Sequence, residues 1–285
     1  CNYLNKADHG FDHYVPANEG AAVGLAIGNY LSTGKPACVY MQNSGIGNIV
    51  NPVTSLANQA VYDIPILFVV GWRGEPGKKD EPQHRFMGEI TRSILDVLEI
   101  PNVVLSADMT EEEITQIFEE AGRALLEHKQ FAIVVKRDAL ETDDKIAYEN
   151  SFTLCREEAI SEIIKSVSPD DVIVSTTGKI SREVYEQCDK IRGHHKQAFL
   201  TVGGMGHAGM IAFGIAQQAN EKKVYCIVGD GAVLMHMGAL AFLAKQAPEN
   251  FVHICLNNDA HESVGGMPTG AVGKEFYKVA GECGY

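Results

Sequence analysis

The chain has 285 residues, enough for one or two domains that each bury a core of their own. Hydrophobic residues make up 45% of it and charged residues 21%, which is typical of a globular protein. With 24 basic and 37 acidic residues the formal charge is −13, which argues against a nucleic-acid partner. An anionic ligand would need a local positive site, because the overall field repels it.

No apolar run approaches the roughly 18 residues of a membrane-spanning segment, and no signal peptide is visible, so we expect no membrane partner. The seven cysteines form no Cys-x-x-Cys pair. Cys38, Cys226 and Cys255 lie in apolar, strand-like runs, where cysteine acts as a small core residue. We therefore expect reduced cysteines and a cytoplasmic protein.

The first half alternates between helix-like and strand-like segments. Asn18–Leu31 predicts a helix, because Asn18 suits an N-cap and an apolar stripe follows it. The later elements expected here are a strand at 37–41, a helix at 53–60, strands at 64–70 and 103–105 around a helix at 85–98, a helix at 111–127 and a strand at 132–135. This alternation indicates an α/β layer with a parallel sheet.

The pattern restarts after a polar segment without apolar periodicity, and we place a linker at 139–152 between domains 1–138 and 153–285. The second half predicts helices at 156–166, 182–187, 209–219 and 234–244, and strands at 172–175, 198–202, 224–228 and 251–256. The chain starts without Met and ends abruptly in Gly-Tyr. We therefore expect a fragment whose first domain lacks its N-terminal strand and whose second is truncated at the C-terminus.

Two polar motifs follow neighbouring strands of the second half. Gly229-Asp230-Gly231 comes after the strand at 224–228, and Asn257-Asn258 comes after the strand at 251–256. In a parallel sheet these strand ends meet at the edge where ligands bind. A carboxylate and an amide oxygen suit a hard cation such as Mg²⁺, and glycines let the backbone approach a phosphate. The spacing therefore predicts a magnesium–diphosphate cofactor.

A competing motif stands just before. Gly204-Met205-Gly206-His207-Ala208-Gly209 fits the GxGxxG fingerprint of dinucleotide-binding domains, and Asp230 follows about 20 residues later. That interpretation explains neither the glycines on both sides of Asp230 nor Asn257-Asn258. A nucleotide- or NAD-binding Rossmann-like module without chemistry of its own nevertheless remains the alternative from a different class.

Gly-Asp-Gly, this spacer and Asn-Asn resemble the signature of thiamin diphosphate enzymes. Gly203-Gly204-Met205-Gly206 resembles the Gly-Gly-Leu-Gly of their 2-oxo acid decarboxylase branch, and Asn18-Glu19 before a helix resembles the cofactor-activating segment. Residues 79–84, 177–183 and 203–208 are most similar to phosphonopyruvate decarboxylases, and sulfopyruvate decarboxylases share much of this pattern. The resemblance implies two thiamin diphosphate-binding domains, each a mostly parallel sheet flanked by helices: a pyrimidine-binding domain at 1–138 and a diphosphate-binding domain at 153–285.

The resemblance also implies a ligand set. Mg²⁺ would bind the Asp230 and Asn258 side chains and the Ala260 carbonyl, and Met205 would keep the cofactor bent. The cofactor-binding residues implied are Glu19, Thr176, Thr177, Gly178, Gly204, Met205, Gly206, His207, Gly229, Asp230, Gly231, Ala232 and Asn258. Without the family resemblance, Asp230 is better explained as a turn residue between glycines. Met205 is then equally well explained as a core residue, and Thr176 or Thr177 as a helix cap.

In the family, the glutamate at the position of Glu19 exchanges a proton with the pyrimidine ring, which requires a carboxyl with a raised pKa, as burial among apolar neighbours would give. The alternative is a first-turn glutamate favoured by the helix dipole. The remaining catalytic candidates are Gln83, His84, His207 and His261. Lys79, Arg85, Lys179 and Arg182 are candidates for a substrate anion, against the simpler view that they are solvated surface charges.

Together these features predict thiamin diphosphate- and Mg²⁺-dependent, non-oxidative decarboxylation of 3-phosphonopyruvate to phosphonoacetaldehyde and CO₂, a step of phosphonate biosynthesis. Glu19 and Asp230 lie in different halves, and family members join such halves from different subunits. We therefore expect a homo-oligomer, at least a dimer, with active sites between subunits. Sulfopyruvate decarboxylase and a carboligase are the nearest alternatives.

Overall fold

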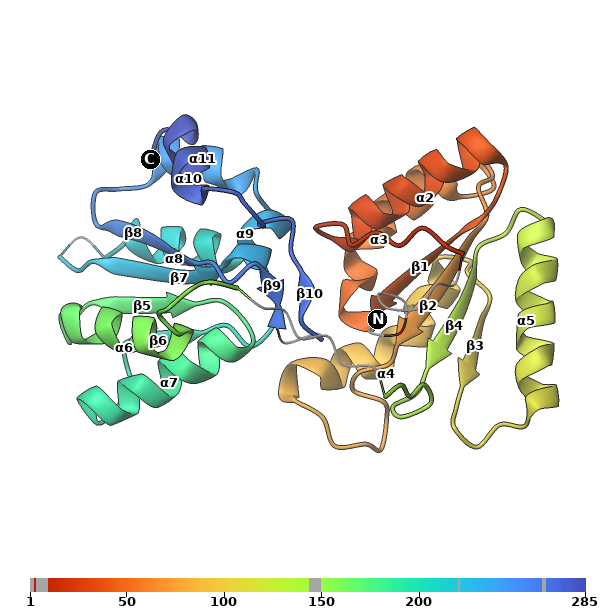
Figure 1. Cartoon of the computed structure of the whole chain (residues 1–285), viewed down its shortest axis with the longest axis horizontal. Helices are drawn as coiled ribbons and strands as arrows, with labels where there is room; N and C mark the ends of the chain where they lie inside the picture. Colours follow the sequence, from red (N-terminus) through yellow and green to blue (C-terminus); the bar gives the residue numbers. More distant parts are fainter. Residues whose placement is uncertain (1–2, 4–9, 144–149, 220, 263–264) are drawn as a thin grey trace. The chain divides into compact units, whose positions relative to one another are not determined.

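The computed structural model describes residue 3 and residues 10–143, 150–219, 221–262 and 265–285. They fall into two compact units, Tyr14–Asp143 and a second that combines Asp144–Tyr285 with the residues up to His13. Each unit contains a four-stranded parallel sheet flanked by helices (Figure 1), which confirms the predicted α/β class. Of the predicted linker 139–152, residues 144–149 lie outside the described residues, and the domain boundaries stay a prediction.

The sheet of the first unit has the strand order β1-β2-β4-β3. Its strands are β1 (Ala37–Gln42), β2 (Ile66–Gly71), β3 (Asn102–Leu105) and β4 (Phe131–Val135), and its helices are α2 (Glu19–Thr33), α3 (Ile46–Pro52), α4 (Pro82–Val97) and α5 (Glu111–Leu126). Alternate residues of β2 and β4 face opposite sides, so that Phe68 packs with α2, α3 and α4 whereas Ile133 packs with α5. Both faces are therefore covered, as apolar parallel strands require.

Helix α2 begins where the sequence predicts. The Asn18 side chain caps it by accepting a hydrogen bond from the Ala21 backbone N–H at 2.9 Å. Gly34 ends it in the left-handed conformation with φ 67°. Val23 and Ala26 of the predicted apolar stripe are buried against β1 and α3.

The helix predicted at 53–60 is wrong in its bounds. A 3₁₀ turn at Asn43–Gly45 leads into α3, and a π-helical turn at Val53–Ala57 follows. Pro52 lies in the last turn of α3 and has no N–H, so it cannot bond the carbonyl of Asn48, and the helix widens directly after it. The Asn48 carbonyl also lies close to Gly20 of α2, because a Cβ on Gly20 would be 3.0 Å from its oxygen.

The second unit has the strand order β6-β5-β7-β8. Its strands are β5 (Val172–Ser175), β6 (Ala198–Leu200), β7 (Val224–Gly229) and β8 (Phe251–Leu256), and its helices are α6 (Arg156–Ser166), α7 (Lys179–Arg192), α8 (Ala208–Ala216), α9 (Asp230–Met235), α10 (Ala239–Gln246) and α11 (Phe276–Cys283). One face of the sheet packs on α6 and α7, and the other on α8, α10 and α11. No helix in the described part of the chain is both long and apolar enough to cross a bilayer.

Two predictions for the second unit need correction, and three elements were missed. The helix expected at 234–244 is two helices, α9 and α10, interrupted at His236, and α9 already begins at Asp230. Helix α7 begins three residues before the predicted start at Arg182 and ends five residues after the predicted end at Gln187. A short antiparallel pair, β9 (Ala260–His261) and β10 (Met267–Pro268), and helix α11 were not predicted.

Candidate active site

The loops that leave the second sheet meet at one edge. All four strands run parallel, with Ser175 paired to Ile227 and Gly229 paired to Leu256. The segments that follow the strands therefore lie side by side, and they contain most of the predicted cofactor residues. These segments are 201–207 after β6, 176–178 after β5, 230–232 after β7 and 257–261 after β8.

Asp230 is the first residue of α9 and only 2% exposed. The N–H dipoles of the helix start favour its negative charge. Its carboxylate oxygen Oδ2 accepts a hydrogen bond from the Thr269 hydroxyl at 2.5 Å. Among the described residues, no lysine, arginine or histidine forms an ion pair with Asp230. A buried carboxylate without a basic partner fits a bound cation, which would supply the missing positive charge.

The segment after β8 turns sharply at Asp259, which adopts φ 59°. The Asn258 side chain accepts a hydrogen bond from the Ala260 N–H at 3.3 Å, so its oxygen lies on the inside of this turn. Ala260 pairs with Pro268, which has no N–H, and the neighbouring carbonyls of Asp259 and His261 accept the bonds that close the β9–β10 pair. The Ala260 carbonyl is thereby left outside this ladder.

Two other predicted residues converge on Gly231. A Cβ at this position would lie 2.8 Å from the His261 ring and 3.2 Å from the end of the Met205 side chain. Only glycine therefore fits there. Burial lowers the pKa of His261, and the negative charge of Asp230 opposes that shift. The loop after β6 and the segment after β8 thus meet over the start of α9.

Thr176 follows β5 and is 4% exposed, and its hydroxyl oxygen has no hydrogen-bond partner within the described protein. Thr177 and Gly178 lead from it into α7, and Gly178 has φ 81°. A buried hydroxyl without a partner, beside the start of a helix, is a fitting donor for a diphosphate oxygen. Together with Asp230 it makes the edge of the sheet suitable for a metal–diphosphate group.

Lys179, a candidate for a substrate anion, is instead engaged in an ion-pair network. Both Lys179 and Arg156 bind the carboxylate of Glu262, and Arg156 also forms two hydrogen bonds to Glu183, at 2.6 and 2.7 Å. The Arg156 and Glu183 side chains are only 19% and 18% exposed. This network fastens the residue after His261 to the first turns of α6 and α7.

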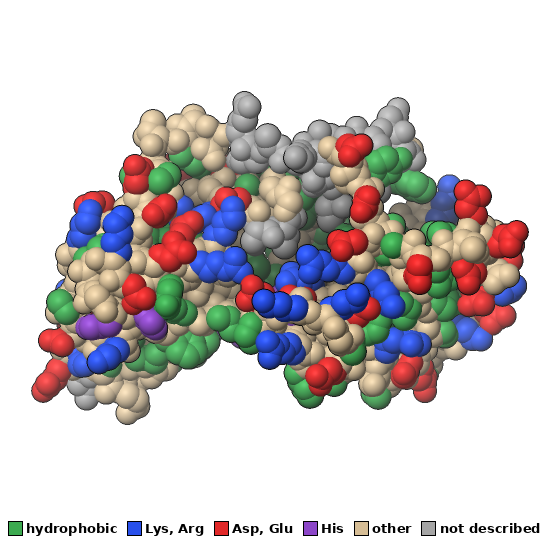
Figure 2. Space-filling view, turned by 90° about the horizontal axis from the view of Figure 1, so that it is seen from below, with side chains coloured by type: hydrophobic (Ala, Val, Ile, Leu, Met, Phe, Trp, Pro, Cys, Tyr) green, Lys and Arg blue, Asp and Glu red, His purple; other side chains and the backbone are tan. Residues whose placement is uncertain are grey.

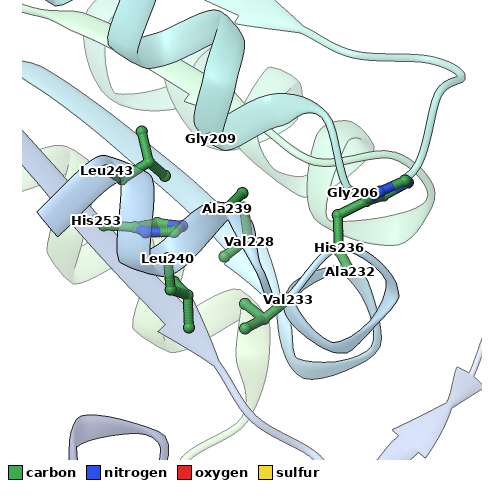
Figure 3. A pocket seen from close by; sticks show the side chains of 10 residues that line it. All are labelled: Gly206, Gly209, Val228, Ala232, Val233, His236, Ala239, Leu240, Leu243 and His253. Carbon is green, nitrogen blue, oxygen red and sulfur yellow. The ribbon is translucent and has the colours of Figure 1, made fainter. Parts of the chain in front are cut away.

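The loop Gly204–His207 depends on two glycines with positive φ, 66° at Gly204 and 87° at Gly206. His236 packs directly on Gly206, where a Cβ would lie 2.3 Å from its ring (Figure 3). His207 bonds the Gly204 carbonyl through Nδ1 at 3.0 Å, so that nitrogen carries the proton. The His207 and His236 rings lie 4.7 Å apart.

A small pocket lies beneath this loop, between α8, α9, α10 and the sheet (Figure 3). Its lining is apolar except for His236 and His253. His253 contacts the Tyr285 hydroxyl through Nδ1 at 3.0 Å, and burial lowers its pKa to about 4, so its ring is neutral. The pocket therefore belongs to the packing that supports the loop.

Glu19, in the first unit, is the first residue of α2 and half-buried. Its Oε2 accepts a hydrogen bond from the Asn48 side chain at 2.7 Å. Its other oxygen, Oε1, lies over Gly45, where a Cβ would be 2.3 Å away. The Glu19 carboxylate thus bonds an amide and lies against a glycine, while its expected role stays a prediction.

Gln83 and His84 lie in the first turn of α4. Gly74 and Gly88 let the preceding loop cross this helix at close range, and Asp80 fastens the loop through two hydrogen bonds from Arg73 and one each from the Gly74 and Glu81 N–H groups. Burial and the nearby Arg73 lower the pKa of His84. The side-chain amide oxygen of Gln83, Oε1, is buried and has no hydrogen-bond partner among the described residues.

Lys79 and Arg85 flank this turn, and neither forms an ion pair with any described residue. By contrast, Arg73 is occupied by Asp80. Figure 2 shows Lys and Arg side chains mixed with Asp and Glu on one face of the protein, so local positive charge is present despite the acidic balance. Lys79 and Arg85 therefore remain the candidates in this unit for binding an anion.

Comparison with known proteins defines the class. Residues 1–97 match the model of the thiamine pyrophosphate enzyme N-terminal TPP binding domain, and residues 177–284 match that of the C-terminal TPP binding domain. Thiamine pyrophosphate is thiamin diphosphate, so these matches support the cofactor and agree with the domain types predicted from the motifs.

Relatives matched over all or nearly all of this chain narrow the class. Phosphonopyruvate decarboxylases of Streptomyces viridochromogenes and Streptomyces hygroscopicus are 35% and 32% identical, each over 100% of this chain and 75% and 74% of their own length. Sulfopyruvate decarboxylase of Methanosarcina acetivorans is 27% identical over 95% of this chain and 72% of its own. The chain therefore belongs to the thiamin diphosphate-dependent 2-oxo acid decarboxylases, which are carboxy-lyases.

The family and the enzyme class predicted from the sequence are thus confirmed, while the role of each residue stays a prediction. Four residues with a place in the site were missed: Asn48, His236, Glu262 and Thr269. None of them belongs to a recognisable motif. Each is defined only by what its side chain touches in the fold.

Proposed function

We propose that the chain decarboxylates 3-phosphonopyruvate to phosphonoacetaldehyde and CO₂, as a step of phosphonate biosynthesis. The substrate rests on one observation: the two relatives matched over the whole chain at 35% and 32% identity are phosphonopyruvate decarboxylases. Sulfopyruvate is the second candidate, because a sulfopyruvate decarboxylase matches at 27% over 95% of the chain and both substrates end in a tetrahedral anion.

The cofactor is held with Mg²⁺ at the edge of the second sheet. Asp230, Asn258 and the Ala260 carbonyl bind the ion, and Thr176, Thr177 and the N–H groups after Gly178 bind the diphosphate. The buried charge of Asp230 without a basic partner and the unpartnered Thr176 hydroxyl support this assignment. Met205, close to Gly231, gives the cofactor an apolar surface to rest on.

Thiamin diphosphate, when bound, supplies a nucleophilic carbon and an electron sink for the departing CO₂. Glu19 would exchange a proton with the pyrimidine end through Oε1, because its Oε2 is occupied by the Asn48 amide. His84, whose lowered pKa keeps it neutral near pH 7, and His261 are the candidates for moving a proton at the substrate. Lys79 and Arg85 hold the phosphonate, which Arg suits by its planar fork.

The functional protein is a homo-oligomer, at least a dimer, with each active site shared between subunits. Helix α2 carries no charged residue after Glu19 and exposes an uncharged face that includes Leu25 and Leu31. Helix α8 is apolar throughout, yet its Met210 is 39% exposed, near an exposed Phe242 that packs on Phe213. Uncharged exposed faces of this kind are typical of surfaces that pack against another protein.

The deciding experiment is a decarboxylation assay of the purified chain on phosphonopyruvate and sulfopyruvate, with and without thiamin diphosphate and Mg²⁺. We expect CO₂ and phosphonoacetaldehyde only when both additions are present, and faster turnover of the phosphonate. Faster turnover of sulfopyruvate would move the assignment to that substrate. A hydroxy-ketone product would indicate a carboligase, and binding of NAD in place of thiamin diphosphate would contradict the enzyme altogether.

A further inference from the structure

Thr269 connects the two segments that carry the proposed metal ligands. It follows β10 and is 5% exposed. Its backbone N–H donates to the Asp259 carbonyl at 2.9 Å, which closes the hairpin that holds Asn258 and Ala260. Its hydroxyl donates to Asp230 Oδ2 at 2.5 Å. One residue thus ties the turn after β8 to the start of α9.

The direction of the hydroxyl bond follows because an ionised carboxylate can only accept, and a third contact agrees with it. The Ala271 backbone N–H reaches the Thr269 oxygen at 3.2 Å, and an N–H can only donate. The hydroxyl therefore accepts there, and its single proton is free for the carboxylate of Asp230. The buried Thr269 hydroxyl is therefore bonded on both sides, and it fixes the position of Asp230 Oδ2.

This bond leaves the two oxygens of Asp230 in different situations. Oδ2 is occupied by a short, charge-assisted hydrogen bond, which a cation would have to weaken in order to share that oxygen. Oδ1 is left to meet the ion. A carboxylate that offers one oxygen suits Mg²⁺, which demands near-ideal octahedral geometry, whereas Ca²⁺ accepts carboxylates through both oxygens and tolerates irregular sites.

We infer that Thr269 is a positioning residue that makes Asp230 a one-oxygen ligand and thereby selects Mg²⁺ over Ca²⁺. The inference rests on the magnesium site of the proposed function and adds a residue and a selectivity to it. Without the hydroxyl, Asp230 can rotate and offer both oxygens. Binding of Mg²⁺ then weakens, and binding of Ca²⁺ weakens less or improves.

The test is metal binding by the full chain saturated with thiamin diphosphate, measured by isothermal titration calorimetry with MgCl₂ and with CaCl₂. In Thr269→Val, which keeps the shape and removes the hydroxyl, we expect the ratio of Mg²⁺ to Ca²⁺ affinity to fall about tenfold or more, the range of lost outer-sphere partners. Thr269→Ser, which keeps the hydroxyl, should stay close to the unmodified protein.

Thr91→Val is the matched control. Thr91 is fully buried in the other unit, where its hydroxyl bonds the Asn43 amide and the Met87 carbonyl. This variant should lower the midpoint of thermal unfolding and leave the ratio of the two affinities unchanged. A ratio in Thr269→Val that equals the unmodified one, or a ratio that falls equally in Thr269→Ser, would overturn the inference.

Failure of the wider proposal looks different. If the unmodified chain binds neither ion in the presence of thiamin diphosphate, the magnesium site itself is wrong and the inference goes with it. If Thr269→Val does not fold, a crystal structure of the unmodified chain with thiamin diphosphate and Mg²⁺ decides. Two oxygens of Asp230 on the ion, or a broken Thr269–Asp230 bond, would overturn the role of Thr269 alone.

Discussion

The two units share an architecture, but their candidate carboxylates, Glu19 and Asp230, differ in burial and in hydrogen bonding. Glu19 and Asp230 are both the first residues of helices, where the dipole favours a negative charge. Asp230 is 2% exposed and bonded to a buried hydroxyl, whereas Glu19 is half-buried and bonded to the partly exposed amide of Asn48. The carboxylate proposed to bind the metal is thus the more deeply buried of the two, and the one proposed to exchange a proton is the more exposed.

Segments next to candidate catalytic histidines are fastened by arginine–carboxylate contacts in both units. In the first unit, Arg73 grips Asp80 and so fixes the loop before α4. In the second, Arg156 grips Glu183 and Glu262 and so fixes the residue that follows His261. In the first unit a two-bond arginine–carboxylate pair, which is geometrically specific, holds the loop before His84. In the second, Arg156 makes its two-bond pair with Glu183 and reaches Glu262, the residue after His261, through a single hydrogen bond.

The largest expected effect comes from Asp230→Asn, which removes the charge and keeps the shape. Binding of Mg²⁺ in the presence of thiamin diphosphate should weaken by more than about 100-fold, the upper range for lost outer-sphere partners of a metal. Calorimetry measures this directly. The exposed Asp170→Asn serves as the control and should bind as before. Retained Mg²⁺ binding in Asp230→Asn would contradict the proposed role of Asp230 as a metal ligand, and with it the contrast between Asp230 and Glu19.

Glu19→Gln should separate turnover from binding. The amide cannot exchange a proton, so decarboxylation should fall by about 10²–10⁴-fold, the usual contribution of a general acid–base group. Cofactor and Mg²⁺ should still bind, because the proposed metal ligands are untouched. Steady-state kinetics and calorimetry on one preparation give both results, with the exposed Glu89→Gln as the control. Full turnover in Glu19→Gln would remove the proton-exchange role.

The sequence reveals the elements of this fold where a segment carries its own signal. Apolar runs bounded by polar residues predict β5 and β8 correctly, and Asn18 marks the start of α2. The prediction fails where long-range packing decides. The Leu234–Ala244 stretch looks like one helix, but His236 packs against Gly206 from a distant loop, and the helix breaks there.

The residues of the candidate site fall into the same two groups, those with a local sequence signal and those without one. The sequence identifies Asp230 and Asn258 as candidates because they follow two strands that are predicted to be neighbours. Their motifs also resemble the signature of thiamin diphosphate enzymes. Thr269 is not identified in this way, because nothing in its local sequence indicates that its hydroxyl reaches a carboxylate 39 residues away. The same holds for Asn48, whose partner Glu19 is 29 residues distant. Side chains that support the site are visible only after folding.

A smaller effect, confined to the first unit, is expected in Asp80→Asn. Arg73 and two backbone N–H groups hold the pKa of Asp80 well below its usual range. The charged form is thus preferred in the folded state, so its stabilisation is complete above the unfolded pKa of about 3.9 and declines as the pH falls below it. At pH 7 the variant should lose about 2 kcal/mol, the contribution of hydrogen bonds to a charged group.

Urea unfolding at several pH values measures this deficit. The chain's single tryptophan, Trp72, donates to the Gly88 carbonyl at 2.9 Å in the same unit, so its fluorescence reports on this region. The deficit should shrink as the pH falls below about 4, where Asp80 of the unmodified chain begins to lose its advantage. Asp108→Asn, on an exposed loop, should change little. A deficit that is constant with pH would show that the ion pair is not its source.

The smallest predicted effect has the opposite sign and concerns the turn beside the metal ligands. Asp259 adopts φ 59°, which disfavours any residue with a Cβ, and its Oδ1 is buried without a partner. Asp259→Gly removes both faults, so the second unit should gain about 1 kcal/mol after the added flexibility of glycine is subtracted. Glu99→Gly, with φ 58° but an exposed side chain, relieves only the backbone and should gain less.

Differential scanning calorimetry without cofactor measures the stability of both variants. A loss of stability in Asp259→Gly would mean that the Asp259 carboxylate forms a stabilising bond in the assembled protein. The second unit would then have two bonded carboxylates at its sheet edge, Asp230 and Asp259, whereas the first unit has only Glu19 in this comparison.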